Sequence, residues 1–372
     1  MTDRKPRRTL SRIMVAASLL FLAAAAALSA AARLIPGFAQ SYSTTVYPAL
    51  VSSIGKFAGK AGFSVAEALC IILPVILIAD IIVQIRRLRR ARADRQRRPG
   101  TFPARLLLLI SFLIFLYSAN CNVNYYRDPF VSAQIYTYAQ FTQDTLEEFC
   151  EFTLTQLEKS SENLAASGAK TFHSFYPEGN GLSHSAIAAM TSLSGRYPAL
   201  RGFYPHPKQL TVLSRFFSMM GVSGIYSPFT IEANINGEMP GMEKPFTACH
   251  ELSHLRGFMN EGEANFIGWL ACIGSGDPAF ERSGWLIAWN YAAGSLRAAD
   301  PDAFARLASR LPADVIAELQ DNHNFWETHE NKASEIQDQL NDTYLKSNGQ
   351  KEGIQSYGRL TTLMLLWYRG MI

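Results

Sequence analysis

Cysteine is scarce in this 372-residue sequence, and no two cysteines are closely spaced. The five cysteines include no C-x-x-C pair, which argues against the common zinc sites built from thiolates. Four of them follow residue 119 and could form two disulfides in an oxidising compartment, so their redox state stays open. The chain also lacks internal repeats and a glycine-rich phosphate-binding motif, which excludes the repeat architectures and phosphate-binding loops that such patterns indicate.

Acidic residues are rare in the first third of the chain. Residues 1–119 hold 17 Lys/Arg and only 4 Asp/Glu, whereas residues 120–372 hold 18 and 27. The two parts therefore carry opposite charge, +13 and −9, and are expected to meet different surroundings. We expect no nucleic-acid partner, because the basic part is apolar and membrane-like while the other part is acidic.

Three apolar stretches lie in the basic part, at residues 13–32, 64–85 and 104–119. About 20 apolar residues in a helix cross a hydrocarbon core of about 30 Å, so we predict three transmembrane helices. A cleaved signal peptide is the alternative for the first stretch, but its length and the stretches that follow favour a retained anchor. Glu67 and Asp80 lie near the two ends of the second stretch, where we expect them to be solvated.

Basic residues flank these stretches unevenly. Five Lys/Arg precede the first stretch and nine lie in residues 86–105, but residues 33–63 hold only three. The positive-inside rule then places the N-terminus and residues 86–105 in the cytoplasm and everything after Ala119 outside it. We therefore divide the chain into a membrane anchor, residues 1–119, embedded in the lipid bilayer, and an extracytoplasmic domain, residues 120–372.

Residues 250–254 read His-Glu-Leu-Ser-His and match the H-E-x-x-H motif of zinc peptidases. Positions i and i+4 share one face of a helix, so His250 and His254 can bind the same Zn²⁺. Glu251 then lies beside the ion, where it can take a proton from zinc-activated water. A surface helix whose histidines point into solvent is the alternative that these five residues alone leave open.

A catalytic zinc site needs a third protein ligand. Residues 261–265, Glu-Gly-Glu-Ala-Asn, resemble the E-x-x-[AS]-[DN] signature of the gluzincin metallopeptidases. The resemblance implies that Glu261 is the third ligand and that Asn265 orients a zinc-bound histidine. Only six residues separate His254 from Glu261, which is shorter than in many gluzincins, so Glu263 remains the second choice for the ligand.

The metzincin pattern H-E-x-x-H-x-x-G-x-x-H offers a competing alignment. It places Gly257 at the glycine and Asn260 at the third ligand, but a neutral asparagine is a poor zinc ligand beside an available carboxylate. Under both alignments Gly257 lets the backbone leave the motif helix sharply.

The remaining patterns predict a helix-rich domain with a little β-structure. Apolar spacing predicts helices over residues 128–166 and 282–296, and partly β-branched alternation predicts a strand over residues 230–235. In zincins, a strand before the metal helix can pair with an extended substrate, so we take residues 224–236 as the substrate edge. For Glu232 within it we expect a structural role. The short apolar run near the C-terminus should pack into the domain.

Several segments resemble a bacterial membrane-protein family catalogued as domain of unknown function 3810: residues 124–127, 224–229, 245–258 and 261–266. The resemblance covers most of the chain, including the apolar stretches. It implies a distant, zincin-like metallopeptidase domain whose substrate is not established. The expected fold is mainly α, with three N-terminal transmembrane helices followed by an extracytoplasmic, zincin-like α+β domain rich in helices.

The sequence thus predicts a membrane-anchored zinc metallopeptidase that hydrolyses peptide or protein substrates outside the cytoplasm. Glu251 is the expected general base, and Tyr291, Arg256 and His323 are candidates for stabilising the oxyanion. The alternative is a protein without turnover, a metal-binding sensor or scaffold of the cell envelope.

Overall fold

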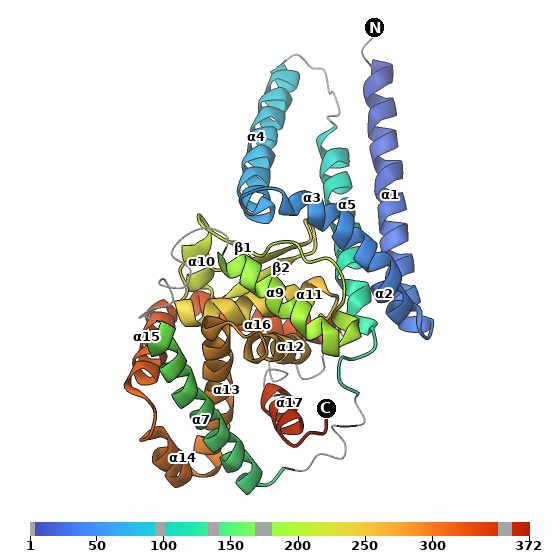
Figure 1. Ribbon diagram of the computed structural model, residues 1–372. Coiled ribbons are helices and arrows are strands. Elements are labelled where there is room, and N and C mark those ends of the chain that lie inside the picture. The colour runs from blue at the N-terminus through green and yellow to red at the C-terminus, as the bar shows by residue number, and fades with distance from the viewer. Residues whose placement is uncertain (1–3, 94–100, 133–134, 136–140, 168–180, 349–358) are drawn as a thin grey trace.

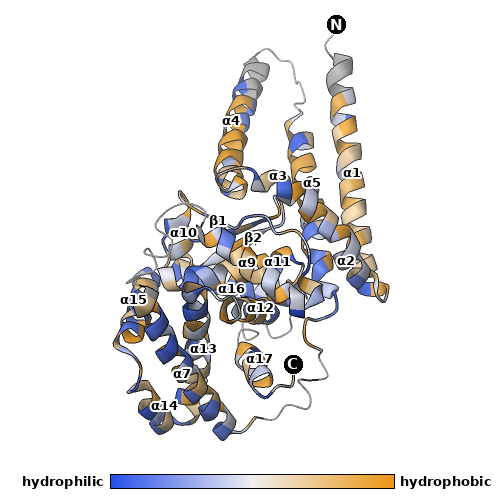
Figure 2. Ribbon diagram, viewed as in Figure 1, coloured by the Kyte–Doolittle hydropathy of each residue, from blue (hydrophilic) through white to orange (hydrophobic). Residues whose placement is uncertain are grey.

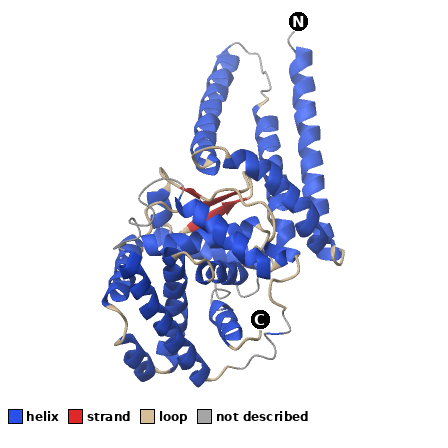
Figure 3. Cartoon of the chain, viewed as in Figure 1, coloured by secondary structure: helices blue, strands red, loops and turns tan. Residues whose placement is uncertain are grey.

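The computed structural model describes residues 4–93, 101–132, 135, 141–167, 181–348 and 359–372. Three long helices project from one side of a domain built of shorter helices and a small sheet (Figures 1 and 3). Residues 94–100 of the predicted cytoplasmic loop, and residues 133–134 and 136–140 of the predicted helix over 128–166, lie outside the described residues. The fold is mainly helical, as predicted.

The three long helices coincide with the three predicted apolar stretches. They are α1 (Arg4–Leu34), α4 (Val65–Ala93) and α5 (Phe102–Asn120). Each is long and apolar enough to cross a membrane, over Thr9–Leu34, Val65–Arg86 and Phe102–Tyr126, and we call these the first, second and third spans. Hydrophobic colouring runs along α1 and α4 in Figure 2.

Asp80 in the second span is not simply solvated, contrary to our expectation. Its carboxylate lies 2.7 Å from Nη2 of Arg105, which stands in the first turn of α5. The ion pair joins the two helices and offsets the cost of a charge within an apolar segment.

The segment between the first two spans belongs to the core of the domain. It forms α2 (Phe38–Leu50), a π-helical turn (Val51–Gly55) and α3 (Lys56–Gly59). Tyr47 and Val51 are fully buried in the main hydrophobic core. The Tyr47 hydroxyl lies 2.8 Å from that of Tyr226. The folded unit therefore uses residues from both sides of the second span.

Two buried carboxylates attach the start of the second span to the domain. Glu232 accepts hydrogen bonds from the backbone amides of Val65 (3.1 Å) and Ala66 (2.8 Å), so its role is structural, as expected. Glu67 accepts hydrogen bonds from the amides of Thr211 (3.0 Å) and Leu213 (2.8 Å). The solvated role predicted for Glu67 is wrong, because these amides replace water around its carboxylate.

A three-stranded sheet has the order β1-β3-β2. The strand β3 (Glu232–Ile235) pairs in parallel with β1 (Lys208–Gln209) and antiparallel with β2 (Gly224–Ser227), with Gly224 opposite Ile235. The predicted strand over 230–235 begins two residues late, because Ile231 has a φ of 53° in the turn. The predicted edge over 224–236 is likewise a hairpin, interrupted after Ser227 because Pro228 cannot donate a ladder hydrogen bond. Its free edge is β2.

The remaining helices surround this sheet and build the lower part of the domain in Figure 1. Their bounds are α7 (Gln143–Ser167), α9 (Gly181–Arg196), α10 (Ser214–Met219), α11 (Lys244–Leu255), α12 (Glu261–Ile273), α13 (Pro278–Ala299), α14 (Pro301–Ala308), α15 (Ala313–His329), α16 (Lys332–Ser347) and α17 (Arg359–Tyr368); three short 3-10 turns span Asn122–Tyr126, Pro198–Leu200 and Gly241–Glu243. The helix predicted over 282–296 lies within α13. Of the helix predicted over 128–166, residues 128–132 are not helical, because Pro129 lies just after the extended Arg127 and interrupts the pattern, and α7 covers Gln143–Ser167.

Tryptophan packing joins the helices behind the sheet. The ring of Trp269 on α12 lies perpendicular to Trp285 on α13 and to Trp367 on α17, with centroids 6.1 Å and 5.0 Å away. The C-terminal apolar run packs into the domain, as predicted, with Leu363 and Leu366 fully buried. All five cysteines are free thiols in this structure.

Candidate metal centre

The motif residues lie on α11, whose ends follow from local sequence. Pro245 occupies the first turn, where its missing amide costs no hydrogen bond. Gly257 ends the helix with a φ of 83°, and its amide donates to the carbonyl of His254 at 2.8 Å. This is the sharp exit that the glycine predicts. Asn260 then caps α12 by accepting a hydrogen bond from the amide of Glu263.

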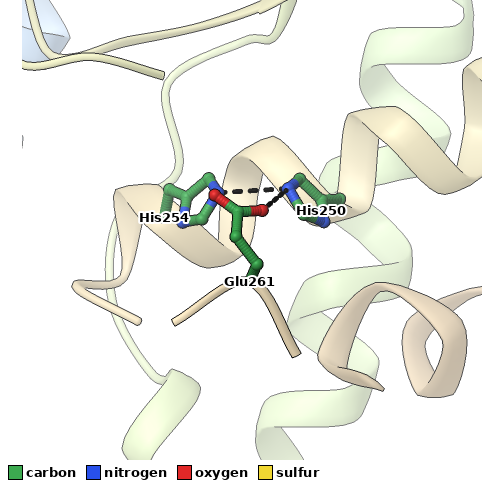
Figure 4. Close-up of side chains that lie close together, drawn as sticks. All are labelled: His250, His254 and Glu261. Atoms are coloured by element: carbon green, nitrogen blue, oxygen red, sulfur yellow. Dashed lines mark hydrogen bonds and ion pairs between the residues drawn. The ribbon is translucent and has the colours of Figure 1, made fainter. Parts of the chain in front are cut away.

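Three of the predicted metal ligands come together where α11 and α12 meet (Figure 4). The Nε2 atoms of His250 and His254 are 3.1 Å apart. Glu261 places Oε2 3.3 Å from Nε2 of His250 and Oε1 3.7 Å from Nε2 of His254. One ligand atom from each residue lies within 4.8 Å of the others, which is close enough for one ion to contact all three.

Neighbouring groups orient both imidazoles. The Nδ1 atom of His254 lies 2.7 Å from the carbonyl oxygen of Phe258, to which it must donate. In the neutral ring, Nε2 of His254 then carries a lone pair directed at the cluster. Asn265, one turn beyond Glu261, makes a side-chain hydrogen bond to His250 that favours the protonated ring. Asn265 therefore lies where the gluzincin resemblance places a histidine-orienting partner.

The electrostatics of the cluster suit a divalent cation. Burial lowers the pKa of His254 to about 4, outweighing the attraction of Glu261. Burial alone would raise the pKa of Glu261, but His254 and His250 outweigh it and lower that pKa. For His250, burial is outweighed by Glu261, Glu251 and Asn265, so its pKa is raised. A buried carboxylate beside a neutral imidazole is a donor set that Zn²⁺ accepts, so the residues present fit the metal.

Glu251 points toward the strand β2 beside the cluster. Glu251 is only 3% exposed, and its Oε2 atom has no hydrogen-bond partner among the described residues. Burial raises its pKa to about 8. A Cβ atom added to Gly224 would lie 2.5 Å from Oε1, so only glycine lets the β2 backbone pass this close. Our sequence analysis did not single out Gly224, although a glycine that starts a strand is a signal for such an approach.

Glu263, the second choice for the third ligand, lies outside the cluster. Its Oε1 atom accepts a hydrogen bond from the amide of Phe130 at 2.7 Å, and its charge faces Arg127. Burial raises its pKa to about 7. The carboxylate of Glu263 thus binds the backbone at Phe130 and does not face the cluster.

The three oxyanion candidates occupy different places. Tyr291 lines the same cleft as His250 and Glu251, and burial raises its pKa to about 12. Arg256 instead donates to the carbonyl of Arg201 and stacks against Tyr204. His323 is 73% exposed on α15, where it faces Glu327. Of the three, only Tyr291 reaches the cleft.

The cleft has a volume of about 910 Å³. Its walls are β2, the turn after it, and the helices α11, α12, α13 and α16. The end of the third span also contributes, through Tyr117 and Cys121. Neither this contribution nor that of α16 was anticipated, because no local pattern links these segments to the motif.

These features describe a helix-rich protein with three candidate membrane helices and a His-His-Glu cluster in a cleft. Residues 42–365 match the model of the family described as "Protein of unknown function (DUF3810)", so the chain belongs to that family. The match begins within α2 and includes the second and third spans. No curated protein and no solved structure matches the chain.

Proposed function

We propose that this protein is a membrane-anchored, zinc-dependent metallopeptidase whose domain lies outside the cytoplasm. The observation that carries the proposal is the convergence of His250, His254 and Glu261, with the Glu251 carboxylate beside them. The uneven basic flanks of the spans support the orientation. The free edge of β2 supports a peptide substrate, since an extended chain can add to an exposed strand.

Each cleft residue has a distinct role in this proposal. His250, His254 and Glu261 would hold the ion, and Zn²⁺ supplies Lewis acidity and lowers the pKa of water to about 7. Glu251 accepts the proton of the attacking water as general base, and its unpartnered Oε2 is free to do so. Tyr291 donates a hydrogen bond from its hydroxyl, which stays protonated because its pKa is raised, to the oxyanion.

The test uses the full chain, because Tyr47 and Val51 complete the core of the domain and a fragment starting at residue 120 lacks them. Glu251→Gln keeps the side-chain volume but removes the base. Zinc content and thermal unfolding should be retained, while hydrolysis of a peptide library falls by about 10²–10⁴-fold. The matched control is Glu327→Gln on exposed α15, which should leave all three measurements unchanged.

Two results would contradict the proposal. If Glu251→Gln cleaves peptides as well as the parent, the general-base mechanism is wrong. If both proteins hold zinc and neither cleaves any peptide, the protein is better described as a metal-binding sensor or scaffold.

A further inference from the structure

We propose that the cleft receives the juxtamembrane segment of a second membrane-anchored polypeptide and cuts it about four residues beyond the bilayer surface. The inference rests on the proposed peptidase function and names its substrate class. It follows from where the cleft and the strand β2 stand relative to the third span.

The cleft begins at the C-terminal end of α5, within the third span. The helix α5 has 19 residues, which measure about 28 Å at 1.5 Å per residue, so nearly all of it is needed to cross a hydrocarbon core of about 30 Å. Tyr117 stands in its last turn and lines the cleft, as does Cys121 just beyond it. One wall of the cleft is therefore at the membrane surface.

The strand β2 leads from Glu251 to that same surface. Gly224 at its start lies against Glu251. At its other end, the side-chain amide of Asn120, the last residue of α5, donates to the carbonyl of Pro228 at 2.7 Å. The hydroxyl of Tyr226 donates to the carbonyl of Asn120 at 3.0 Å. The strand thus passes close to Glu251 at one end and is hydrogen-bonded to the end of α5 at the other.

This geometry sets a length for the bound substrate. The four steps from Gly224 to Pro228 measure about 13 Å in an extended chain. A peptide that pairs with the free edge of β2 therefore reaches the membrane surface about four residues from Glu251. A substrate already anchored in the bilayer would enter the cleft in this extended form.

Exposed apolar side chains lie along this path and beside it. Ile225 on β2 is 45% exposed and Phe229 in the following turn is 43% exposed, and both line the cleft. Val212 and Phe216 are also exposed, on the segment that Glu67 holds against the first turn of the second span. Exposed apolar side chains grouped in this way indicate contact with lipid or with an apolar partner.

The spans also hold the cleft at a constant height. Glu232 and Glu67 bind the start of α4 to the domain, and Asn120 binds the end of α5 to the β2 turn. The cleft therefore cannot move far from the membrane. A substrate anchored in the same bilayer meets it at a high effective concentration, whereas a soluble peptide does not.

The first experiment measures binding without turnover. The full chain with Glu251→Gln and a photo-crosslinking amino acid at Ile225 is placed in liposomes. The probe is a synthetic single-span peptide with a randomised eight-residue segment directly outside the bilayer. The same segment without the span is the soluble comparison, and a crosslinker at Phe203, which does not line the cleft, is the matched control. We expect at least about tenfold more crosslinking to the anchored probe at Ile225. Equal crosslinking of both probes, or none of either, overturns the inference.

The second experiment uses the parent protein and the position of the cut. Inserting two or four residues between the span and the segment should shift the cut along the sequence so that its distance from the span stays the same. A cut that remains at one sequence whatever the spacing overturns the inference but leaves the peptidase intact. Crosslinking of the anchored probe without cleavage by the parent overturns the peptidase function instead.

Discussion

The ammonium of Lys208 lies 3.0 Å from the carboxylate of Glu232, and the two side chains are only 7% and 1% exposed. Lys208 also donates to the carbonyl oxygens of Ala58 (2.7 Å) and Phe63 (2.8 Å), just before the second span. A buried pair of this kind is fully hydrogen-bonded, and it joins the central strand β3 to the segment that leads into the second span.

Removing the carboxylate should therefore strongly destabilise the domain. Glu232→Ala leaves the Lys208 charge buried without its partner and should cost on the order of 3–5 kcal/mol. Thermal unfolding of the full chain in detergent measures the loss, with the exposed Glu335→Ala as control. The double variant Glu232→Ala with Lys208→Met should recover part of it. Unfolding like the parent would mean that the pair does not hold the span.

Metal analysis should rank the candidate ligands. Replacing His250 or His254 by alanine should remove nearly all bound zinc, and Glu261→Gln should weaken binding strongly, because these three groups converge. Glu263→Gln should weaken it much less, since Glu263 binds the amide of Phe130. The reverse order for the two glutamates would assign the ligand role to Glu263.

Gly224→Ala should lower peptide hydrolysis, because the added Cβ meets Glu251 Oε1 at 2.5 Å and Thr247 Cγ2 at 2.7 Å. Either β2 or the side chain of Glu251, the proposed general base, must shift. The matched control is Gly294→Ala on α13, where an added Cβ meets nothing within 4 Å. The control should retain activity and stabilise the helix by about 1 kcal/mol. Full activity in Gly224→Ala would show that the close approach has no part in catalysis.

In the metal-free protein the contribution of Glu251 to stability should fall as the pH rises, because burial raises the pKa of Glu251 from 4.5 to about 8. The folded state then binds this proton more tightly than the unfolded chain. Its contribution is fully present below about pH 4.5 and is lost as the pH rises through about 8. The Glu251→Gln variant lacks this contribution. After chelation, the melting temperature of the variant should therefore rise relative to that of the parent as the pH increases from about 4.5 to about 8. A constant difference would contradict the raised pKa.

A reporter enzyme fused after Ala119 should be active only outside the cytoplasm, because the basic residues before α1 and in residues 86–105 favour the inside. A fusion within residues 86–98 should behave in the opposite way. If added protease cannot reach the domain in intact cells but degrades it in inverted vesicles, the orientation is reversed.

Local patterns predicted the parts of the fold that depend on local chemistry. Hydropathy located the three long helices, and helical spacing brought His250 and His254 to one face. The position of Glu261 came from a resemblance to a metallopeptidase signature, and the structure places it within reach of both histidines. Zinc binding and peptide hydrolysis themselves remain proposals.

What the sequence did not reveal depends on contacts between distant segments. Tyr47 lies between two spans, yet it contacts Tyr226, 179 residues away. From the sequence alone, Glu67 is a charge at the boundary of an apolar stretch. The structure shows that its carboxylate accepts hydrogen bonds from the amides of Thr211 and Leu213. The alternating residues 230–235 predicted a strand, but only the pairing shows that β3 is central and that β2, within the predicted edge over 224–236, is an edge strand. Neither the hydropathy nor the spacing of apolar residues reveals these contacts between distant segments.

The burial of Tyr47 and Val51 also imposes an order on biogenesis. This segment is synthesised before the second span, but its partners on β2 and α11 are synthesised only after the third span. Until those partners are made, the apolar side chains of this segment stay exposed. Contacts between residues far apart in sequence form slowly. Packing of the segment between the first two spans and completion of the domain core are therefore one step. A chain in which this segment does not reach the domain leaves the core without Tyr47 and Val51.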